Sequence, residues 1–270
     1  MPARINGTEI YFKIEGPEGA PVVTFSHSLA AGLDMWALQA VAMKDSYRVL
    51  RLDTRGHGKS SVSPDPCTMS TLGADVIGLL DHLGIQRTHF VGLSMGGMIG
   101  QVLALQYPHR LNRLILCDTT GRVPLETAPV WEERIRIAEA EGMAGLLEET
   151  LERWLSEDFR RTHPEITGRV KDLIMQTPVA GYGLCCRAIS RFDVLQELSK
   201  VTAPTLIMVG ERDPGTPVSA AEAIHERIQG SELLIIPGAL HLTNIEKADF
   251  FNRQLLAFLA KGDPIENRSF

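Results

Sequence analysis

The stretch Val91-Gly-Leu-Ser-Met-Gly-Gly97 decides how this chain folds. It joins a short apolar run, His89–Leu93, to a longer run, Met95–Gln106, whose apolar residues have helical spacing. The pattern G-x-S-x-G at such a junction is typical of a sharp strand-to-helix turn that raises a serine hydroxyl above a sheet. The glycines on either side of the serine leave room where strand and helix approach closely. The pattern predicts Ser94 as a nucleophile; a glycine-rich turn with an incidental serine is the alternative.

Outward from this turn, strands and helices alternate along the chain. Apolar runs bounded by turn residues predict strands at residues 4–14, 20–27, 47–53, 89–93, 111–117, 205–209 and 232–236. Helical spacing predicts helices at residues 70–83, 95–106, 219–228 and 250–259. Ser70 is the expected N-cap of the first of these helices. This alternation indicates an α/β fold with a mostly parallel sheet and helices on both of its faces.

The alternation stops in the middle of the chain. From about Val123 to about Phe192 the pattern is almost purely helical. We therefore predict that residues 1–122 and 193–270 form the α/β core and that residues 123–192 form a helical lid, or cap, inserted into it. A lid over Ser94 would exclude water and shape the substrate pocket.

An acid and a base follow two of the later predicted strands. Asp213 comes after the strand at 205–209, and His241 comes after the strand at 232–236. Open α/β sheets place their ligands at these strand ends. The chain order Ser94, Asp213, His241 suits acyl transfer: the histidine takes the serine proton, and the aspartate orients the histidine. The plainer alternatives are a turn aspartate before a proline and a polar residue at a helix start.

Three other carboxylates compete for the role of the acid: Glu211, Asp193 and Asp118. Asp118 follows another predicted strand, so its carboxyl group also lies at the sheet edge. We prefer Asp213, because its distance beyond the strand suits a loop that reaches toward the histidine. Glu211 lies nearer the strand end and is expected to point elsewhere.

Backbone N–H groups are expected to stabilise the oxyanion. The residue after the serine, Met95, supplies one donor at the start of the helix. The second donor is expected from the loop His27-Ser-Leu-Ala-Ala-Gly32, through the N–H of Leu29. An ordinary loop in which His27 is simply satisfied is the alternative. In the segment Asp53-Thr-Arg-Gly-His-Gly-Lys-Ser60 we expect a structural role, with Asp53 and Arg55 pinning a loop and His57 architectural.

Composition limits the classes of partner. The chain has 270 residues, 44% of them hydrophobic, and a formal net charge of −6. That charge favours neither nucleic acid nor an anionic membrane as a partner. No apolar run approaches the ~20 residues of a membrane-spanning helix, and the N-terminal residues lack the pattern of a signal peptide. We expect a cytoplasmic enzyme with a small-molecule substrate; the sequence does not specify an oligomeric state.

Cofactor and metal sites are not expected either. The sequence contains neither a CxxC nor an HExxH pattern, so a zinc site is not predicted. The four cysteines include an adjacent pair that is poorly placed to bridge, which favours reduced thiols. They are Cys67, Cys117, Cys185 and Cys186.

These residues together resemble the α/β-hydrolase family over nearly the whole chain, and within it most closely the 3-oxoadipate enol-lactone hydrolases of aromatic catabolism. Four regions carry the resemblance: residues 26–29 with 34–36, 53–58, 181–188 and 238–246. The first and third are the narrower signals. Two positions depart from the family: His27 stands where an Asn or similar residue is usual, and Thr243 where a Ser is usual.

The resemblance implies a pocket in the lid. The family has a Trp followed three residues later by an Arg, and Trp131 and Arg134 match that spacing, which places both on one helix face. It implies that Trp131 lines the acyl pocket, with lid packing as its alternative, and that Arg134 or Arg187 binds a substrate carboxylate. The implied reaction is hydrolysis of 3-oxoadipate enol-lactone. The alternatives are a broad carboxylesterase, another lactonase, or a ligand-binding receptor of this fold with slow turnover.

Overall fold

The centre of the molecule is a sheet whose middle strands are buried on both faces. The computed structural model describes residues 1–63 and 65–261. The sheet has the strand order β1-β2-β4-β3-β5-β6-β7-β8. The strands are β1 (Pro2–Ile5), β2 (Thr8–Glu15), β3 (Val22–Ser26), β4 (Arg48–Leu52), β5 (Thr88–Leu93), β6 (Leu111–Cys117), β7 (Thr205–Gly210) and β8 (Glu232–Ile236).

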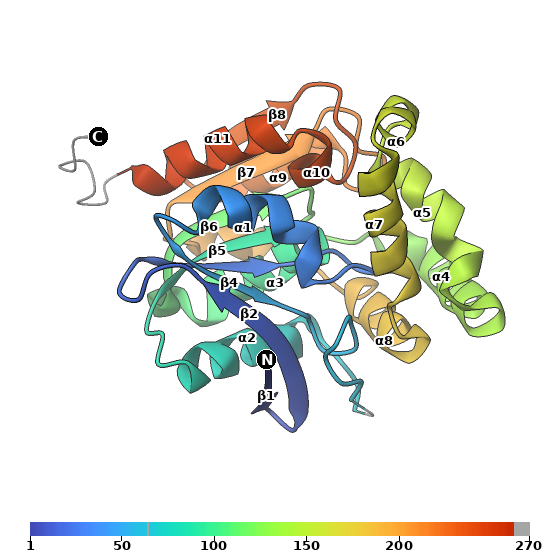
Figure 1. The fold of residues 1–270 in the computed structure, drawn as a ribbon, viewed down its shortest axis with the longest axis horizontal. Coiled ribbons are helices and arrows are strands. Elements are labelled where there is room, and N and C mark those ends of the chain that lie inside the picture. Colours follow the sequence, from blue (N-terminus) through green and yellow to red (C-terminus); the bar gives the residue numbers. More distant parts are fainter. Residues whose placement is uncertain (64, 262–270) are drawn as a thin grey trace.

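The neighbouring strands β4, β3, β5, β6, β7 and β8 pair in parallel. The pairs β1–β2 and β2–β4 are antiparallel. Every residue of β5 and of β7 is buried, as expected for parallel strands covered on both faces. Figure 1 shows α1 and α11 on one side of this sheet and α2 and α3 on the other. The predicted α/β architecture is therefore confirmed.

The helices of the core follow the strands that they cover. They are α1 (Ala37–Met43), α2 (Met69–His82), α3 (Met95–Gln106), α9 (Val218–Arg227), α10 (Thr243–Glu246) and α11 (Ala248–Ala260). The helix at residues 37–43, with the 3₁₀ turn before it at Leu33–Trp36, was not predicted. Its seven residues are too few for helical spacing to stand out from a loop.

Two local predictions were wrong. The single strand predicted at residues 4–14 is a hairpin of β1 and β2, with Asn6 and Gly7 both at positive φ in its turn. Asn-Gly is the typical two-residue turn of a hairpin, so the signal was present in the sequence. The N-cap of α2 is Thr68 rather than Ser70: its hydroxyl accepts the Thr71 N–H at 3.0 Å, and the Thr71 hydroxyl accepts the Thr68 N–H in return.

Between β6 and β7 the named elements of the chain are helices. They are α4 (Ala128–Glu141), α5 (Leu147–Trp154), α6 (Glu157–Thr162), α7 (Pro164–Met175) and α8 (Val179–Ile189), with short 3₁₀ turns. In Figure 1 they gather at one end of the sheet. The two ends of this segment meet, because the Val123 N–H donates to the Phe192 carbonyl at 2.8 Å. We refer to residues 123–192, the segment expected to form a lid, as the lid segment.

The lid segment touches the core at a few close contacts. The Leu242 N–H donates to the Trp154 carbonyl at 3.1 Å, and the Glu246 carboxylate accepts the Ser156 N–H at 3.1 Å. On the far side, α8 lies so close to the loop after β4 that a Cβ added to Gly181 would be 1.9 Å from the Gly56 carbonyl oxygen. These contacts hold the lid segment over the ends of β3, β5 and β7.

Candidate active site

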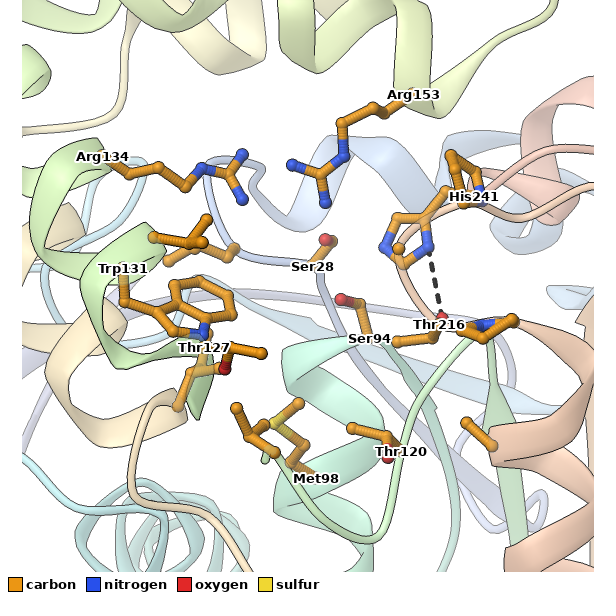
Figure 2. Close-up of a pocket in the computed structure, with 18 of the residues that line it drawn as sticks. Ser28, Ser94, Met98, Thr120, Thr127, Trp131, Arg134, Arg153, Thr216 and His241 are labelled. Atoms are coloured by element: carbon orange, nitrogen blue, oxygen red, sulfur yellow. Dashed lines mark hydrogen bonds between the residues drawn. The ribbon is translucent and has the colours of Figure 1, made fainter. Parts of the chain in front are cut away.

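Ser94 occupies a strained turn between β5 and α3. Its φ is 56° and its ψ is −114°, a backbone conformation that non-glycine residues rarely adopt. Three hydrogen bonds maintain it: the Ser94 N–H donates to the Cys117 carbonyl, and the Ser94 carbonyl accepts from the Met98 N–H and the Thr119 hydroxyl. The turn aims the hydroxyl into a cavity that His241 also lines (Figure 2).

The two glycines of the turn are required by space, as expected. A Cβ added to Gly92 would lie 2.1 Å from the Gly96 carbonyl oxygen. One added to Gly96 would lie 2.2 Å from the carbonyl oxygen of Ser26, at the end of β3. Any side chain at either position would therefore push α3 away from the sheet and displace the serine.

Asp213 and His241 are joined directly. The Asp213 Oδ2 lies 2.7 Å from the His241 Nδ1, and both side chains are buried. Asp213 also accepts hydrogen bonds from the N–H groups of Gly215 and Thr216 and from the Thr216 hydroxyl. Figure 2 shows Thr216 beneath the His241 ring, where its hydroxyl lies 3.5 Å from Nδ1. Sequence reasoning missed Thr216, whose only signal is its place three residues after the acid.

The charge of Asp213 is stabilised by these contacts. Burial on its own raises the pKa of the Asp213 carboxyl, but His241, Thr216 and Gly215 outweigh it and hold the pKa below its usual value. The carboxylate is thus ionised at neutral pH and can fix the orientation of the imidazole. Among the described residues no hydrogen bond joins the Ser94 hydroxyl to His241; such contacts often tighten only when substrate is bound.

The three competing carboxylates do not contact His241. Glu211 accepts the N–H of Gly238 in the neighbouring loop, and Asp193 pairs with Arg122 at 3.5 Å. Asp118 is buried behind the pair, where its carboxylate accepts the N–H of Gly210 and the hydroxyl of Thr243. Burial and the nearby charge of Asp213 raise the pKa of Asp118. The Thr243 that departs from the family thus braces the loop after β6.

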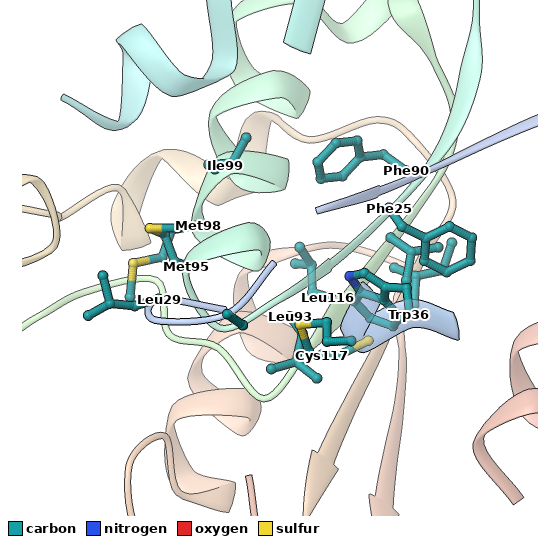
Figure 3. Close-up of a cluster of buried hydrophobic side chains, with 14 of the residues drawn as sticks. Phe25, Leu29, Trp36, Phe90, Leu93, Met95, Met98, Ile99, Leu116 and Cys117 are labelled. Atoms are coloured by element: carbon teal, nitrogen blue, oxygen red, sulfur yellow. The ribbon is translucent and has the colours of Figure 1, made fainter. Parts of the chain in front are cut away.

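The loop after β3 presents a free backbone donor beside the serine. In the described part of the chain, no hydrogen bond uses the N–H of Leu29 or of Met95. The neighbours of Leu29 are held in place, since the Ser28 N–H donates to the Met35 sulfur and the Ala30 N–H donates to the His57 Nε2. Figure 3 shows the Leu29 side chain beside Met95 and next to the start of α3.

Two buried histidines hold this loop in place. The His27 Nδ1 bonds to the Ser28 carbonyl at 2.7 Å, and its Nε2 accepts the Thr54 N–H at 2.9 Å. The His57 ring accepts the Ala30 N–H and lies beside the His27 ring at a tilt of 46°, with ring centroids 5.2 Å apart. Burial lowers the pKa of His27 and lowers that of His57 to about 3, so both rings are neutral. This agrees with the architectural role expected for His57.

The other residues of that segment also serve the framework. The Asp53 carboxylate accepts the N–H groups of Leu33 and Lys59 at 2.7 and 2.9 Å. Arg55 forms a two-pronged ion pair with the buried Asp75 on α2. Asp53 and Arg55 therefore fix the loops near Leu29, which agrees with the structural role expected from the sequence.

The cavity above Ser94 has a volume of about 720 Å³ and is mainly apolar. Trp131 and Arg134 both line it from α4, with the Arg134 guanidinium 5.6 Å from the centre of the Trp131 ring. Arg187 lies elsewhere and faces Glu139 at 3.8 Å, so the structure favours Arg134 of the two arginines considered. A second cavity arginine, Arg153 on α5, was not predicted from the sequence.

No described helix has both the length and the apolar character needed to cross a membrane. Within residues 1–63 and 65–261, the His, Cys, Asp and Glu side chains form no group of three or more that is arranged to hold a metal ion. The four cysteines are free and buried. The absence of a metal and of a cofactor stays a prediction.

Comparison with known proteins adds a family and several relatives. A family model described as alpha/beta hydrolase fold matches residues 21–248. The 3-oxoadipate enol-lactonase 2 of Acinetobacter baylyi is 35% identical over 246 residues, which cover 91% of each chain. The crystal structure of the enol-lactonase from Burkholderia xenovorans superposes with a TM-score of 0.93 at 36% identity, covering 97% of this chain and 100% of that one. A malate-bound thermophilic esterase from Thermogutta terrifontis gives 0.89 at 31% identity, covering 97% and 98%.

Proposed function

The chain belongs to the α/β-hydrolase fold family, and from this premise we propose that it hydrolyses 3-oxoadipate enol-lactone through an acyl-enzyme on Ser94. The observation that carries the proposal is the Asp213–His241 pair, 2.7 Å apart, beside the same cavity as a serine in a strained turn. The chain is a hydrolase, and its similarity to named enol-lactonases supports a lactone as substrate.

The proposed reaction has two acyl-transfer steps. In the first, His241 takes the Ser94 proton as the hydroxyl attacks the lactone carbonyl, and the imidazolium that forms is stabilised by Asp213. The N–H groups of Leu29 and Met95 hold the oxyanion; one such donor is typically worth about 100- to 1,000-fold in rate. The carbonyl–oxygen bond then breaks, and His241 protonates the leaving oxygen.

The second step releases the acid. Water gives a proton to His241 and attacks the acyl-enzyme, and the Ser94 oxygen leaves with that proton. The leaving group of the first step is an enol, which becomes a ketone, so the ring does not readily close again. The lactone also carries a carboxylate, and Arg134 is the proposed partner of that group. Trp131 is proposed to line the acyl pocket beside it.

A broad carboxylesterase or another lactonase is the second candidate. A cavity of about 720 Å³ has more room than a six-carbon lactone fills, and a related esterase shares the fold closely. A slow, receptor-like protein fits less well, because Asp213 contacts His241 beside the cavity that Ser94 also lines. We propose further that residues 123–192 act as the lid over Ser94, and that the enzyme works in the cytoplasm on a small molecule.

A substrate panel tests the proposal. We expect kcat/KM for 3-oxoadipate enol-lactone to exceed that for uncharged lactones and for p-nitrophenyl esters of short acids. A preference for short neutral esters would contradict the enol-lactone assignment and support the esterase. Failure of a fluorophosphonate probe to label the wild-type protein at Ser94 would contradict the acyl-enzyme itself.

A further inference from the structure

Two guanidinium groups project into the same apolar cavity. Arg134 comes from α4 and Arg153 from α5, and both line the space above Ser94 and His241. Figure 2 shows the two side chains extending toward each other, with Ser28 and Ser94 below the gap between them. Arg153 lies next to Gly215, since a Cβ added there would be 3.1 Å from its Nη2. It therefore stands on the acid–base side of the cavity, opposite Trp131.

These two half-buried arginines lack the close carboxylate partner that the buried Arg55 has. Arg55, for comparison, forms a two-pronged pair with Asp75. In the described part of the chain Arg134 forms no ion pair, and its Nε is buried without a hydrogen-bond partner. Arg153 has only Glu149, at 3.7 Å, and that carboxylate is 62% exposed.

The charges of the cavity wall are unbalanced. Its other charged residues are Glu149 and Arg122, and Arg122 is itself exposed and faces Asp193. Burial and then the nearby charge of Arg134 lower the pKa of Arg153, and together they outweigh the opposing charges of Glu149 and Asp213. Two like charges held close together on a mainly apolar wall repel each other, and an anion between them relieves that repulsion. The cavity wall is therefore arranged to receive a negative group.

We propose that Arg153 and Arg134 together form a carboxylate-binding subsite that holds the acidic arm of the substrate in the lid, above the reacting carbonyl. Two guanidinium groups can each give charge-assisted hydrogen bonds to one carboxylate. Arg153 is thus a specificity-determining residue of this enzyme, and its contact selects acids over neutral analogues. This inference rests on the proposed reaction at Ser94 for its role in catalysis, but the subsite binds a carboxylate without any turnover.

A binding experiment without chemistry tests the subsite. The probes are adipate, a six-carbon dicarboxylate of the length of the opened lactone, and adipamide, its neutral isostere, titrated by calorimetry into the wild type and four variants. We expect adipate to bind the wild type at least ~10-fold more tightly than adipamide, and Arg153→Met and Arg134→Met each to remove most of that difference. Arg136→Met is the matched control, because Arg136 is an exposed arginine of α4 that pairs with Glu133.

Arg153→Lys separates charge from shape. It keeps the positive charge but not the planar fork, so we expect an intermediate affinity for adipate. Equal melting temperatures of the variants without ligand show that the lid remains folded. The proposal is overturned if Arg153→Met binds adipate as tightly as the wild type, or if the wild type does not distinguish adipate from adipamide.

Kinetics distinguish this inference from the proposed function. With the enol-lactone, Arg153→Met is expected to raise KM by about 10- to 100-fold, the range of one charge-assisted hydrogen bond, and to leave kcat nearly unchanged. If the wild type binds adipate selectively but does not turn over the lactone, the subsite stands and the enol-lactone assignment fails. If the wild type turns over the lactone and Arg153→Met has an unchanged KM, the subsite fails and the assignment stands.

Discussion

The proposed nucleophile, acid and base come from three separate loops that share one edge of the sheet. Ser94 follows β5, Asp213 follows β7 and His241 follows β8. The serine and its strained turn could be predicted because G-x-S-x-G is a local pattern with a steric cause. Asp213 and His241 could be predicted because strand ends in a parallel sheet meet at one edge. Thr216 and Gly215 were missed, because their only signal is that they follow Asp213 by three and two residues.

Exchange of the acid for its amide tests the role of Asp213. Asp213→Asn keeps an acceptor for the loop N–H groups but places an amide toward His241, which favours the wrong tautomer. We expect kcat to fall by about 10⁴-fold with little change in KM. Glu211→Gln, in the same loop, is the control and should retain activity, because Glu211 contacts only the Gly238 N–H there. Steady-state kinetics of both variants check this. A larger loss of kcat in Glu211→Gln than in Asp213→Asn would show that Asp213 is not the catalytic acid.

The neutral His57 makes stability depend on pH. Its pKa is about 3 in the folded protein, because burial disfavours the charged ring, against about 6.5 in the unfolded chain. Between these values only the unfolded chain binds the proton, so the stabilising contribution is complete above about pH 6.5 and is lost as the pH falls, at about 1.4 kcal/mol per pH unit.

His57→Gln isolates that contribution. The glutamine oxygen can still accept the Ala30 N–H, but the side chain does not titrate. Urea unfolding at about pH 6.5 and about pH 5 should show that the wild type loses about 1 to 2 kcal/mol more than the variant. His27 is present in both proteins, so its own titration cancels in the difference. Parallel losses in the two proteins would mean that His57 is not the neutral, buried group described.

At the scale of elements, the lid segment depends on the close approach of α8 to the loop after β4. Gly181→Ala places a methyl group against the Gly56 carbonyl, so α8 must move outward. We expect a loss of about 1 to 3 kcal/mol in the free energy of unfolding, as for other overpacked sites, and a raised KM. Gly183→Ala, two residues along the same helix, meets only ordinary contacts at 3.5 and 3.6 Å. It should stabilise the protein by about 0.5 to 1 kcal/mol.

Thermal and urea denaturation of the two alanine variants measure this contrast. Equal effects would show that α8 does not pack against the core loop as described.

The helices and strands differ in how well the sequence predicts them. Long periodic helices and buried strands were found within a few residues, but the hairpin turn at Asn6–Gly7 and the short helix Ala37–Met43 were not. Which arginine of an amphipathic helix faces inward depends on the packing of the lid, so Arg153 could not be assigned from sequence.

At the scale of the whole molecule, the core and the lid segment have separate tasks. The core brings together the proposed nucleophile, acid, base and oxyanion donors at one sheet edge, and its sequence signals are strong because each serves a steric or hydrogen-bonding need. The lid segment contributes Trp131, Arg134 and Arg153 from above. Helical spacing predicted the helices of this segment but not which of its side chains line the cavity, and we propose that those side chains select the substrate.

The central claim is that Ser94 forms the acyl-enzyme with 3-oxoadipate enol-lactone. The most direct measurement is the turnover of that lactone by the wild type and by Ser94→Ala at equal concentration, after correction for spontaneous hydrolysis. Loss of the nucleophile in an enzyme of this kind costs up to about 10⁶-fold in kcat, so we predict that the variant shows no measurable turnover above background. Comparable turnover by the two proteins, or none by the wild type, would contradict the account.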